Sequence, residues 1–435
     1  MKKCLGIGGG FAGLSASVHL SNAGYNVELI EASPKLGGRA YSFIHKQTNT
    51  LIDNGQHIMM GCYNETLKFL ELIGASDKIE IQEKLNVKFL KPGFELHELR
   101  SSSSLYPLNL AAAILSYTAI TFRERLSILR LFLKLPFFSQ RDLSKMSVDD
   151  LLIKENQNEK VKKAFWEIIC VGALNTTLKQ AFAKVFVDII KEIFFKGSLG
   201  SKIILPKTNL SEMYCEPAKQ FIETKEGKIF LSENVEEIIV EKNKVVEVRT
   251  DQRSITDFDW LVCSVPFYAA QKILPFLNFK YFNPQYSTIL NVHLWLAKAK
   301  KENSIGERFY ALIGSKLHWV FSHDSHLTCV ISNADYLMSL SNEEILNVIT
   351  VELERYMNIT KHDIKDYFII KEKRATFIPS NEILNNRPNT KTDIKNLFLA
   401  GDWVNTGLPS TIESAVKSGR EAAEEVGTIQ GLKSH

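Results

Sequence analysis

Three glycines near the N-terminus have the spacing that binds the phosphates of a dinucleotide. Gly8, Gly10 and Gly13 follow residues 3–7, a short apolar run that is typical of a buried strand. The first glycine permits a tight turn, the second lets backbone approach a pyrophosphate, and the third lets the next helix pack closely on the strand. The N-terminus of that helix offers backbone N–H groups at its positive end. The spacing therefore predicts a dinucleotide-binding turn.

An acidic residue at the end of the next strand completes this motif. Residues 25–30 are predicted to form a second strand, after a helix that ends at Gly24. The strand leads into Glu31, which is placed to accept hydrogen bonds from the ribose of an adenosine. The contacts predicted for this segment, besides the three glycines, are Phe11, Ala12, Glu31 and Ala32.

A second pair of glycines follows directly, because residues 35–40 read KLGGRA. Backbone N–H groups at Gly38 and the guanidinium of Arg39 are placed to reach the diphosphate and ribityl chain of a flavin cofactor. This extension resembles the flavoprotein oxidoreductases of the amine oxidase and carotenoid desaturase superfamily. It therefore favours FAD over NAD as the cofactor, a choice that the first glycine motif alone leaves open.

A third motif lies near the other end of the chain. Residues 397–400 are predicted to form a short strand, followed by Gly401 and Asp402, a loop, and a helix. Ser410 and Glu413 have the spacing of a capping box at the start of that helix. This order resembles the second flavin motif of the superfamily, in which the acid holds a ribityl hydroxyl or a phosphate-bound water. The resemblance also places the helix N-terminus at the flavin ring, through Thr411 and Ile412.

The elements that position these motifs come from both ends of the chain. We expect an α/β fold, in which a Rossmann-like FAD-binding domain of the GR2 type carries an inserted α+β substrate domain. Residues 228–231, 235–240 and 244–249 are predicted to form a run of strands. The resemblance to the superfamily implies that they form a β meander beside the nucleotide-binding domain, with the backbone of Val235 meeting the adenine. The predicted FAD-binding domain comprises residues 1–61, 206–270 and 371–435. The predicted substrate domain comprises residues 62–205, helical in pattern, and 271–370, which is predicted to form an antiparallel sheet.

Composition and charge exclude several other classes of protein. The 435 residues are 45% hydrophobic and 23% charged, which is ordinary for a globular chain. A net charge of +4 gives no support to a nucleic-acid partner. None of the six cysteines forms a CxxC pair, and His323 and His326 lack a third ligand pattern, so no metal site is predicted. The scattered cysteines indicate reduced thiols in a cytoplasmic protein.

Several collinear blocks resemble one narrower family. They are DNGQHIMMGCYNETL at 53–67, ALNT at 173–176, LSEMYCEPA at 210–218, EKRATF at 372–377, and the long block from Phe398 to Ala423. Together they resemble the squalene-associated FAD-dependent desaturases, now understood as hydroxysqualene dehydroxylases. This resemblance implies reductive removal of an allylic hydroxyl from hydroxysqualene, giving squalene and water, in hopanoid or triterpenoid biosynthesis. It also implies a lipophilic isoprenoid substrate and contact with the synthases upstream.

Such a reaction needs a general acid, because the leaving hydroxyl must be protonated. His57, in the DNGQH block, is the first candidate, since that block should return towards the flavin ring after the GGRA segment. Gln56 and Asp53 are weaker candidates. The alternative interpretation of His57 is structural, as a histidine that hydrogen-bonds backbone in a polar turn.

Three other functions remain open on the sequence. An oxidative desaturase of phytoene or a C30 analogue would have the same fold and cofactor. An amine oxidase would need an aromatic cage and a lysine near the flavin, neither of which is identified in the sequence. A non-catalytic isoprenoid carrier would retain flavin without turnover.

A basic amphipathic segment suggests a peripheral contact with the inner face of the membrane. Residues 122–138 combine many apolar side chains with Arg123, Arg125, Arg130 and Lys134. The same pattern also fits a core helix with solvated cationic edges. No apolar run reaches the ~18 residues that would span a bilayer.

Overall fold

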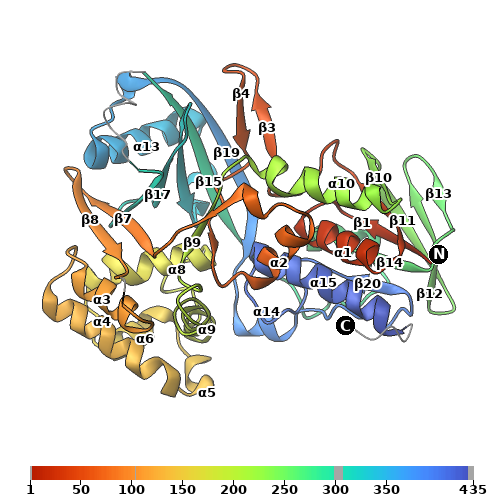
Figure 1. Ribbon diagram of the computed structural model, residues 1–435, viewed down its shortest axis with the longest axis horizontal. Coiled ribbons are helices and arrows are strands. Elements are labelled where there is room, and N and C mark those ends of the chain that lie inside the picture. Colours follow the sequence, from red (N-terminus) through yellow and green to blue (C-terminus); the bar gives the residue numbers. More distant parts are fainter. Residues whose placement is uncertain (1, 103, 298–306, 430–435) are drawn as a thin grey trace.

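A five-stranded parallel sheet gathers strands from both ends and the middle of the chain (Figure 1). This computed structural model describes residues 2–102, 104–297 and 307–429. The sheet order is β10-β2-β1-β14-β20, and each neighbouring pair runs parallel. The strands are β1 (Lys3–Ile7), β2 (Asn26–Glu31), β10 (Lys228–Leu231), β14 (Trp260–Cys263) and β20 (Leu397–Leu399). The predicted α/β nucleotide-binding fold is confirmed.

Two helices from opposite ends of the chain lie side by side on this sheet (Figure 1). They are α1 (Phe11–Asn22) and α15 (Ile412–Ile429). A methyl group placed on Gly419 of α15 would lie 2.2 Å from the carbonyl oxygen of Ala12, so a glycine is needed at this close crossing. Gly24, with φ +84°, follows the end of α1 as predicted.

A second, seven-stranded sheet builds the other half of the molecule. Its order is β19-β15-β18-β17-β16-β7-β8, antiparallel except where β16 runs parallel to β7. Alternate side chains of its strands face α13 (Asn342–Met357) on one side and a layer of helices on the other. The strands are β7 (Asn86–Lys91), β8 (Glu95–Arg100), β15 (Tyr286–Leu296), β16 (Phe309–Leu312), β17 (Trp319–Ser322), β18 (Leu327–Ser332) and β19 (Ile364–Phe377).

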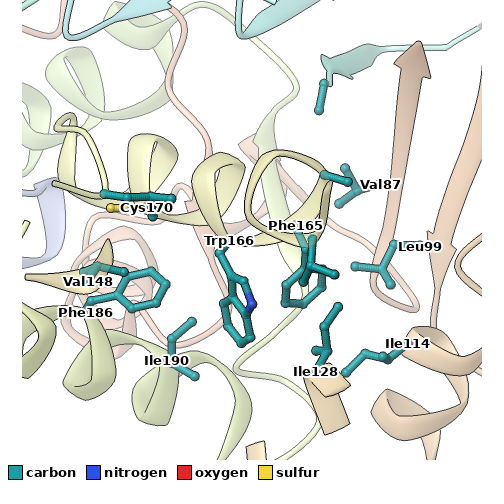
Figure 2. Packing of buried hydrophobic residues seen from close by; sticks show 14 of the residues in the cluster. Val87, Leu99, Ile114, Ile128, Val148, Phe165, Trp166, Cys170, Phe186 and Ile190 are labelled. Atoms are coloured by element: carbon teal, nitrogen blue, oxygen red, sulfur yellow. The ribbon is translucent and has the colours of Figure 1, made fainter. Parts of the chain in front are cut away.

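The helical layer packs around two adjacent aromatic residues (Figure 2). Phe165 and Trp166 lie edge to face, with ring centroids 4.8 Å apart, and Trp166 Nε1 donates to Gln157. Both rings come from a π-helical turn, Lys162–Trp166, in the middle of this layer. The layer comprises α3 (Leu108–Ser116), α4 (Phe122–Lys134), α5 (Gln140–Leu143), α6 (Val148–Lys154), α7 (Glu159–Val161), α8 (Glu167–Leu174) and α9 (Ala183–Phe194).

The remaining elements pack around these two sheets. A small sheet joins β5 (Met59–Met60), β9 (Ile203–Pro206) and β6 (Ile79–Ile81), and the meander comprises β11 (Val235–Glu241), β12 (Lys244–Thr250) and β13 (Ser254–Ile255). The helices are α2 (Asn64–Leu72), α10 (Glu216–Thr224), α11 (Phe267–Ile273) and α14 (Asn381–Asn385).

The structure corrects several details of the predicted organisation. The segment 228–231 pairs with β2 in the parallel sheet and is not part of the meander. Residues 62–205 are not purely helical, because β7 and β8 extend the large sheet. The predicted limits at 205/206 and 370/371 fall inside β9 and β19. Positions 1 and 103 and residues 298–306 and 430–435 of the predicted domains lie outside the described residues.

Candidate functional site

The first glycine turn is built around contacts that only glycine allows. Gly8 has φ +100°, a left-handed conformation that side chains disfavour. A methyl group on Gly13 would lie 1.8 Å from the carbonyl oxygen of Gly8, so the helix can approach the strand only without a side chain. Gly10 is the N-cap of α1 and no side chain caps that helix end. The turn therefore leaves the positive end of α1 open to an anion.

The KLGGRA segment lies directly against this turn. Gly37 N donates to the carbonyl of Gly9 at 2.8 Å, and a methyl group on Gly38 would lie 3.2 Å from Gly10 Cα. Gly38 itself is exposed and has φ +58°. The first glycine turn and the Gly37–Gly38 segment thus form one backbone-lined cradle.

Glu31 at the end of β2 fixes the same turn. Its Oε2 accepts from Gly9 N at 2.6 Å and its Oε1 accepts from Ser33 N at 2.7 Å. Ala32 is exposed beside it. The backbone N–H of Glu233 donates to the carbonyl of Glu31, which brings the start of β11 at Val235 to this edge of the sheet. The residues predicted to meet the adenosine therefore lie close together.

The side chains of Phe11 and Ala12 are occupied by packing. The ring of Phe11 stacks on Tyr214 at 3.7 Å with an interplanar angle of 7°. Ala12 is buried among residues of α1, β14 and α15. Only the backbone of these two residues is therefore directed to the predicted phosphate site.

An ion pair joins the two ends of the site. Arg39 Nη2 lies 2.7 Å from Asp402 Oδ1, and Arg39 also donates to the carbonyl of Ala375 at 2.7 Å. Burial opposes ionisation of Asp402. Arg39, the hydroxyl of Ser410 and Arg387 outweigh this effect and lower the pKa of the Asp402 carboxyl. Asp402 is thus held as a carboxylate beside the glycine cradle.

Arg387 is a residue of this site that the sequence analysis missed. Its guanidinium is buried and donates to the carbonyls of Asp402, Trp403, Val404 and Leu408. Burial lowers its pKa to about 10, which still leaves it charged at neutral pH. An arginine before a Pro-Asn turn carries no motif, so no sequence signal distinguished it from a surface cation.

The predicted capping box of α15 is wrong. Thr411 is the residue that caps the helix, because its Oγ1 accepts from Ser414 N at 3.2 Å. Ser410 instead donates to Asp402. Glu413 instead reaches the N-terminus of α2, where it accepts from the N–H groups of Glu65 and Thr66 at 2.9 Å. In this position the Glu413 carboxylate stabilises α2, because it satisfies two backbone N–H groups at the buried start of that helix.

A hairpin returns the DNGQH block to this site, as the sequence predicted. The hairpin comprises β3 (Ser42–His45) and β4 (Thr50–Asp53). Asp53 Oδ1 accepts from Ser42 Oγ at 2.7 Å and Leu210 N at 3.0 Å, and burial raises its pKa. Asn54 Nδ2 donates to the carbonyl of Arg39 at 3.0 Å. The block therefore lies beside the GGRA segment, with Asp53 occupied by structural contacts.

The two predicted catalytic residues follow this turn. His57 Nδ1 lies 2.9 Å from the carbonyl oxygen of Gly55, so its Nε2 is the ring atom left for chemistry. Burial, and then the charge of Arg39, lower the pKa of His57. Gln56 is half-buried. Their position beside Arg39 fits a role at the cofactor, and that role remains a prediction.

Asn291 on β15 also meets this turn and was missed. Its Oδ1 is buried without a hydrogen-bond partner, and a methyl group on Gly55 would lie 3.0 Å from its Nδ2. Buried amide oxygens rarely lack a partner. Asn291 lies in a strand of mainly apolar residues, and nothing in that pattern indicated a role for this one polar side chain.

These residues together fit a dinucleotide cofactor. The cradle offers backbone and a helix N-terminus to phosphates, and Glu31 lies where a ribose would bind. Among residues 2–102, 104–297 and 307–429, no group of three His, Cys, Asp or Glu side chains could hold a metal. The His323 and His326 rings stack at 4.5 Å.

Comparison with known proteins places these motifs in a family. The model of a family described as flavin containing amine oxidoreductase matches residues 11–427. Hydroxysqualene dehydroxylase of Zymomonas mobilis is 26% identical over 430 residues, covering 96% of this chain and 97% of that protein. The enzyme of the same name from Sinorhizobium fredii is 27% identical and covers 96% of both chains. Zeta-carotene desaturase of Capsicum annuum is 22% identical, covering 96% of this chain and 79% of that protein.

Solved structures share the fold along the whole chain. An oxidoreductase from Methanosarcina mazei superposes with a TM-score of 0.73 at 17% identity, covering 97% of this chain and all of the other. Cyclohexylamine oxidase from Brevibacterium oxydans gives a TM-score of 0.71 at 15% identity and covers 99% of both chains.

Proposed function

The chain belongs to the family of flavin-containing amine oxidoreductases, and within it we propose that this protein reductively removes the allylic hydroxyl of hydroxysqualene. It is an FAD-dependent oxidoreductase, and the products of the proposed reaction are squalene and water. The C–O bond breaks and a C–H bond forms at the same carbon, which consumes one hydride and one proton.

End-to-end similarity to proteins named hydroxysqualene dehydroxylase carries this proposal. Those relatives align over 96–97% of their own length, whereas the desaturase from Capsicum annuum aligns over 79% of its length. The DNGQH block lies beside Arg39, through the bond from Asn54 to the Arg39 carbonyl, and this supports the proposal, because the predicted acid His57 belongs to that block.

Bound FAD, once reduced, supplies the hydride in this chemistry. The Gly10–Gly38 cradle and the start of α1 would hold its phosphates, and Glu31 its ribose. The ion pair of Arg39 with Asp402 fixes the segment that approaches the flavin. These groups would orient the cofactor, and the proton would come from a separate residue.

His57 is the residue we propose for that proton. Its Nδ1 is directed to the carbonyl of Gly55, so the proton would be taken up and released at Nε2, towards the leaving oxygen. The lowered pKa of His57 makes its protonated form a stronger acid than an ordinary histidine. The neighbouring Gln56 would orient the hydroxyl.

An anaerobic assay tests the reaction directly. FAD-loaded protein is chemically reduced and mixed with hydroxysqualene in detergent micelles, and squalene is followed by mass spectrometry. We expect squalene to form in step with flavin reoxidation. Absence of squalene with flavin that stays reduced would contradict the proposal. The oxidised protein would then be tested on phytoene and its C30 analogue, for the desaturase, and on alkyl amines, for the amine oxidase.

A further inference from the structure

Helix α4 carries large apolar side chains on its outer side as well as its inner side. The inner side is buried in the helical layer, at Ile128 and Leu131. On the outer side of α4 and of the 3-10 turn that follows it (Leu135–Phe137), four residues recur at helical spacing and are between 46% and 86% exposed. We call these four residues the outer row: Phe122, Leu126, Leu133 and Phe137. An exposed apolar row of this kind marks an interaction site.

The rest of the outer side is cationic. Every exposed residue from position 122 to position 137 is apolar or positively charged, and the charged ones are Arg123, Arg130 and Lys134. The acid of this helix, Glu124, is turned away, because its carboxylate accepts from Thr121 and from Asn158. The outer side of α4 therefore offers apolar contact and positive charge, and no negative charge.

The structure separates the four cations that the sequence grouped together. Arg125 is half-buried and donates to the carbonyls of Leu115 and Ile120. Lys134 forms an ion pair with Glu155. Arg123 and Arg130 have no ion pair within the described part of the chain, so they are the charges available to a partner.

The neighbouring helix α3 also has exposed apolar residues near one of its ends. The bond from Arg125 to Leu115 ties the end of α3 to the start of α4. At the other end of α3, Leu105 and Leu108 are 85% and 66% exposed. Both helices lie at one corner of the molecule, far from α1 and α15 (Figure 1).

We propose that the outer row, with Arg123 and Arg130 beside it, docks on the surface of a bilayer that contains anionic lipid. Apolar side chains would enter the headgroup boundary, while the arginines meet lipid phosphates. A second copy of the chain fits less well, because a two-fold interface would place this outer side against itself, and it has no exposed acid to pair with Arg123 and Arg130. Among the described helices none is long and apolar enough to cross a membrane.

Vesicle flotation of the FAD-loaded protein tests this contact without substrate, so the outcome is independent of the proposed reaction. We expect flotation with phosphatidylcholine vesicles that contain phosphatidylglycerol, and much less with phosphatidylcholine alone. The triple variant Leu126→Ser, Leu133→Ser, Phe137→Ser should weaken binding by at least about tenfold. The double variant Arg123→Gln, Arg130→Gln should weaken it by about fivefold per arginine at low salt.

The control variants change exposed apolar and cationic residues elsewhere on the protein. Val351 on α13 is 62% exposed, so Val351→Ser should float like the unchanged protein. Lys225→Gln with Lys228→Gln removes two exposed charges from the flavin half and should also float normally. The flavin absorption spectrum verifies folding of each variant. Equal flotation of the outer-row variant, or a dimer in solution that the variant dissociates, would overturn the proposal.

Discussion

The guanidinium of Arg39 and the carboxylate of Asp402 form a 2.7 Å ion pair between residues 363 positions apart in the chain. Each residue belongs to a different glycine motif, so the pair fastens the two halves of the proposed cofactor site to each other. Asp402 also accepts from Ser410, at the start of α15. The ion pair therefore links the glycine cradle near the N-terminus to the loop that precedes α15 near the C-terminus.

Loss of this charge should weaken the hold on FAD. Asp402→Asn preserves the shape of the side chain and removes the attraction for Arg39, so we expect FAD affinity to fall by about tenfold or more. Fluorescence titration of the apoprotein with FAD measures the change. Asp257→Asn serves as the control, because it removes an exposed ion pair with Lys3. Unchanged affinity in Asp402→Asn would contradict the role.

The Asp402 carboxylate should also make the free energy of unfolding depend on pH in the acidic range. The pKa of Asp402 is lower in the folded protein than in the unfolded chain, so its stabilising contribution is complete above the ordinary carboxyl pKa and is lost as pH falls through the folded value. Urea unfolding of the unchanged protein and Asp402→Asn should give a difference in unfolding free energy that shrinks with acidification in this range. A constant difference would contradict the linkage.

Two glycine-to-alanine substitutions should change the stability of the folded protein in opposite directions. Gly13→Ala forces a methyl group to within 1.8 Å of a backbone oxygen, so we expect a loss of about 2 kcal/mol or more. Gly427→Ala in α15 meets no atom within 4 Å and should stabilise by up to about 1 kcal/mol, since alanine favours helix. Thermal unfolding of the apoprotein compares the two. If the two variants have similar stability, the backbone around Gly13 can move to accommodate a methyl group, and the prediction is wrong.

Arg387 should be needed for the loop that carries Asp402. Arg387→Leu would leave several buried carbonyls of residues 402–408 without a donor, each costing ~1–3 kcal/mol if it stays dry. We expect a lower melting temperature and FAD loss on desalting. Arg387→Lys keeps the charge and can replace only part of the contacts, so it should be intermediate. If both variants retain FAD as the unchanged protein does, the prediction is wrong, and water must satisfy the carbonyls that the guanidinium contacts.

His57 should control the pH dependence of turnover. The protonated imidazole is the donor, and its pKa is lowered, so kcat should fall as pH rises through a value below the ordinary histidine pKa. His57→Phe should keep FAD, lose at least ~100-fold in kcat, and lose this pH dependence. Gln56→Leu should change KM more than kcat. A pH profile that is identical in His57→Phe would exclude His57 as the acid.

Local patterns in the sequence were enough for the cofactor site in outline. A strand, a glycine turn and a helix are neighbours in the chain, so Gly8, Gly10, Gly13 and Glu31 could be assigned from spacing. The same holds for the strand at 397–399 and Gly401. Ser341 and Glu344 likewise have the spacing of a capping box, and they form one at the start of α13, because that cap depends on residues three apart.

Only the tertiary structure decided which partner each polar side chain takes. Glu413 has the spacing to cap its own helix, yet it caps α2, because the chain fold brings a second set of free N–H groups closer. Arg387 and Asn291 carry no motif and become part of the site only through burial beside residues distant in sequence. Hydrogen bonds and ion pairs depend on distance in space, which spacing along the chain fixes within one turn or helix and not between them.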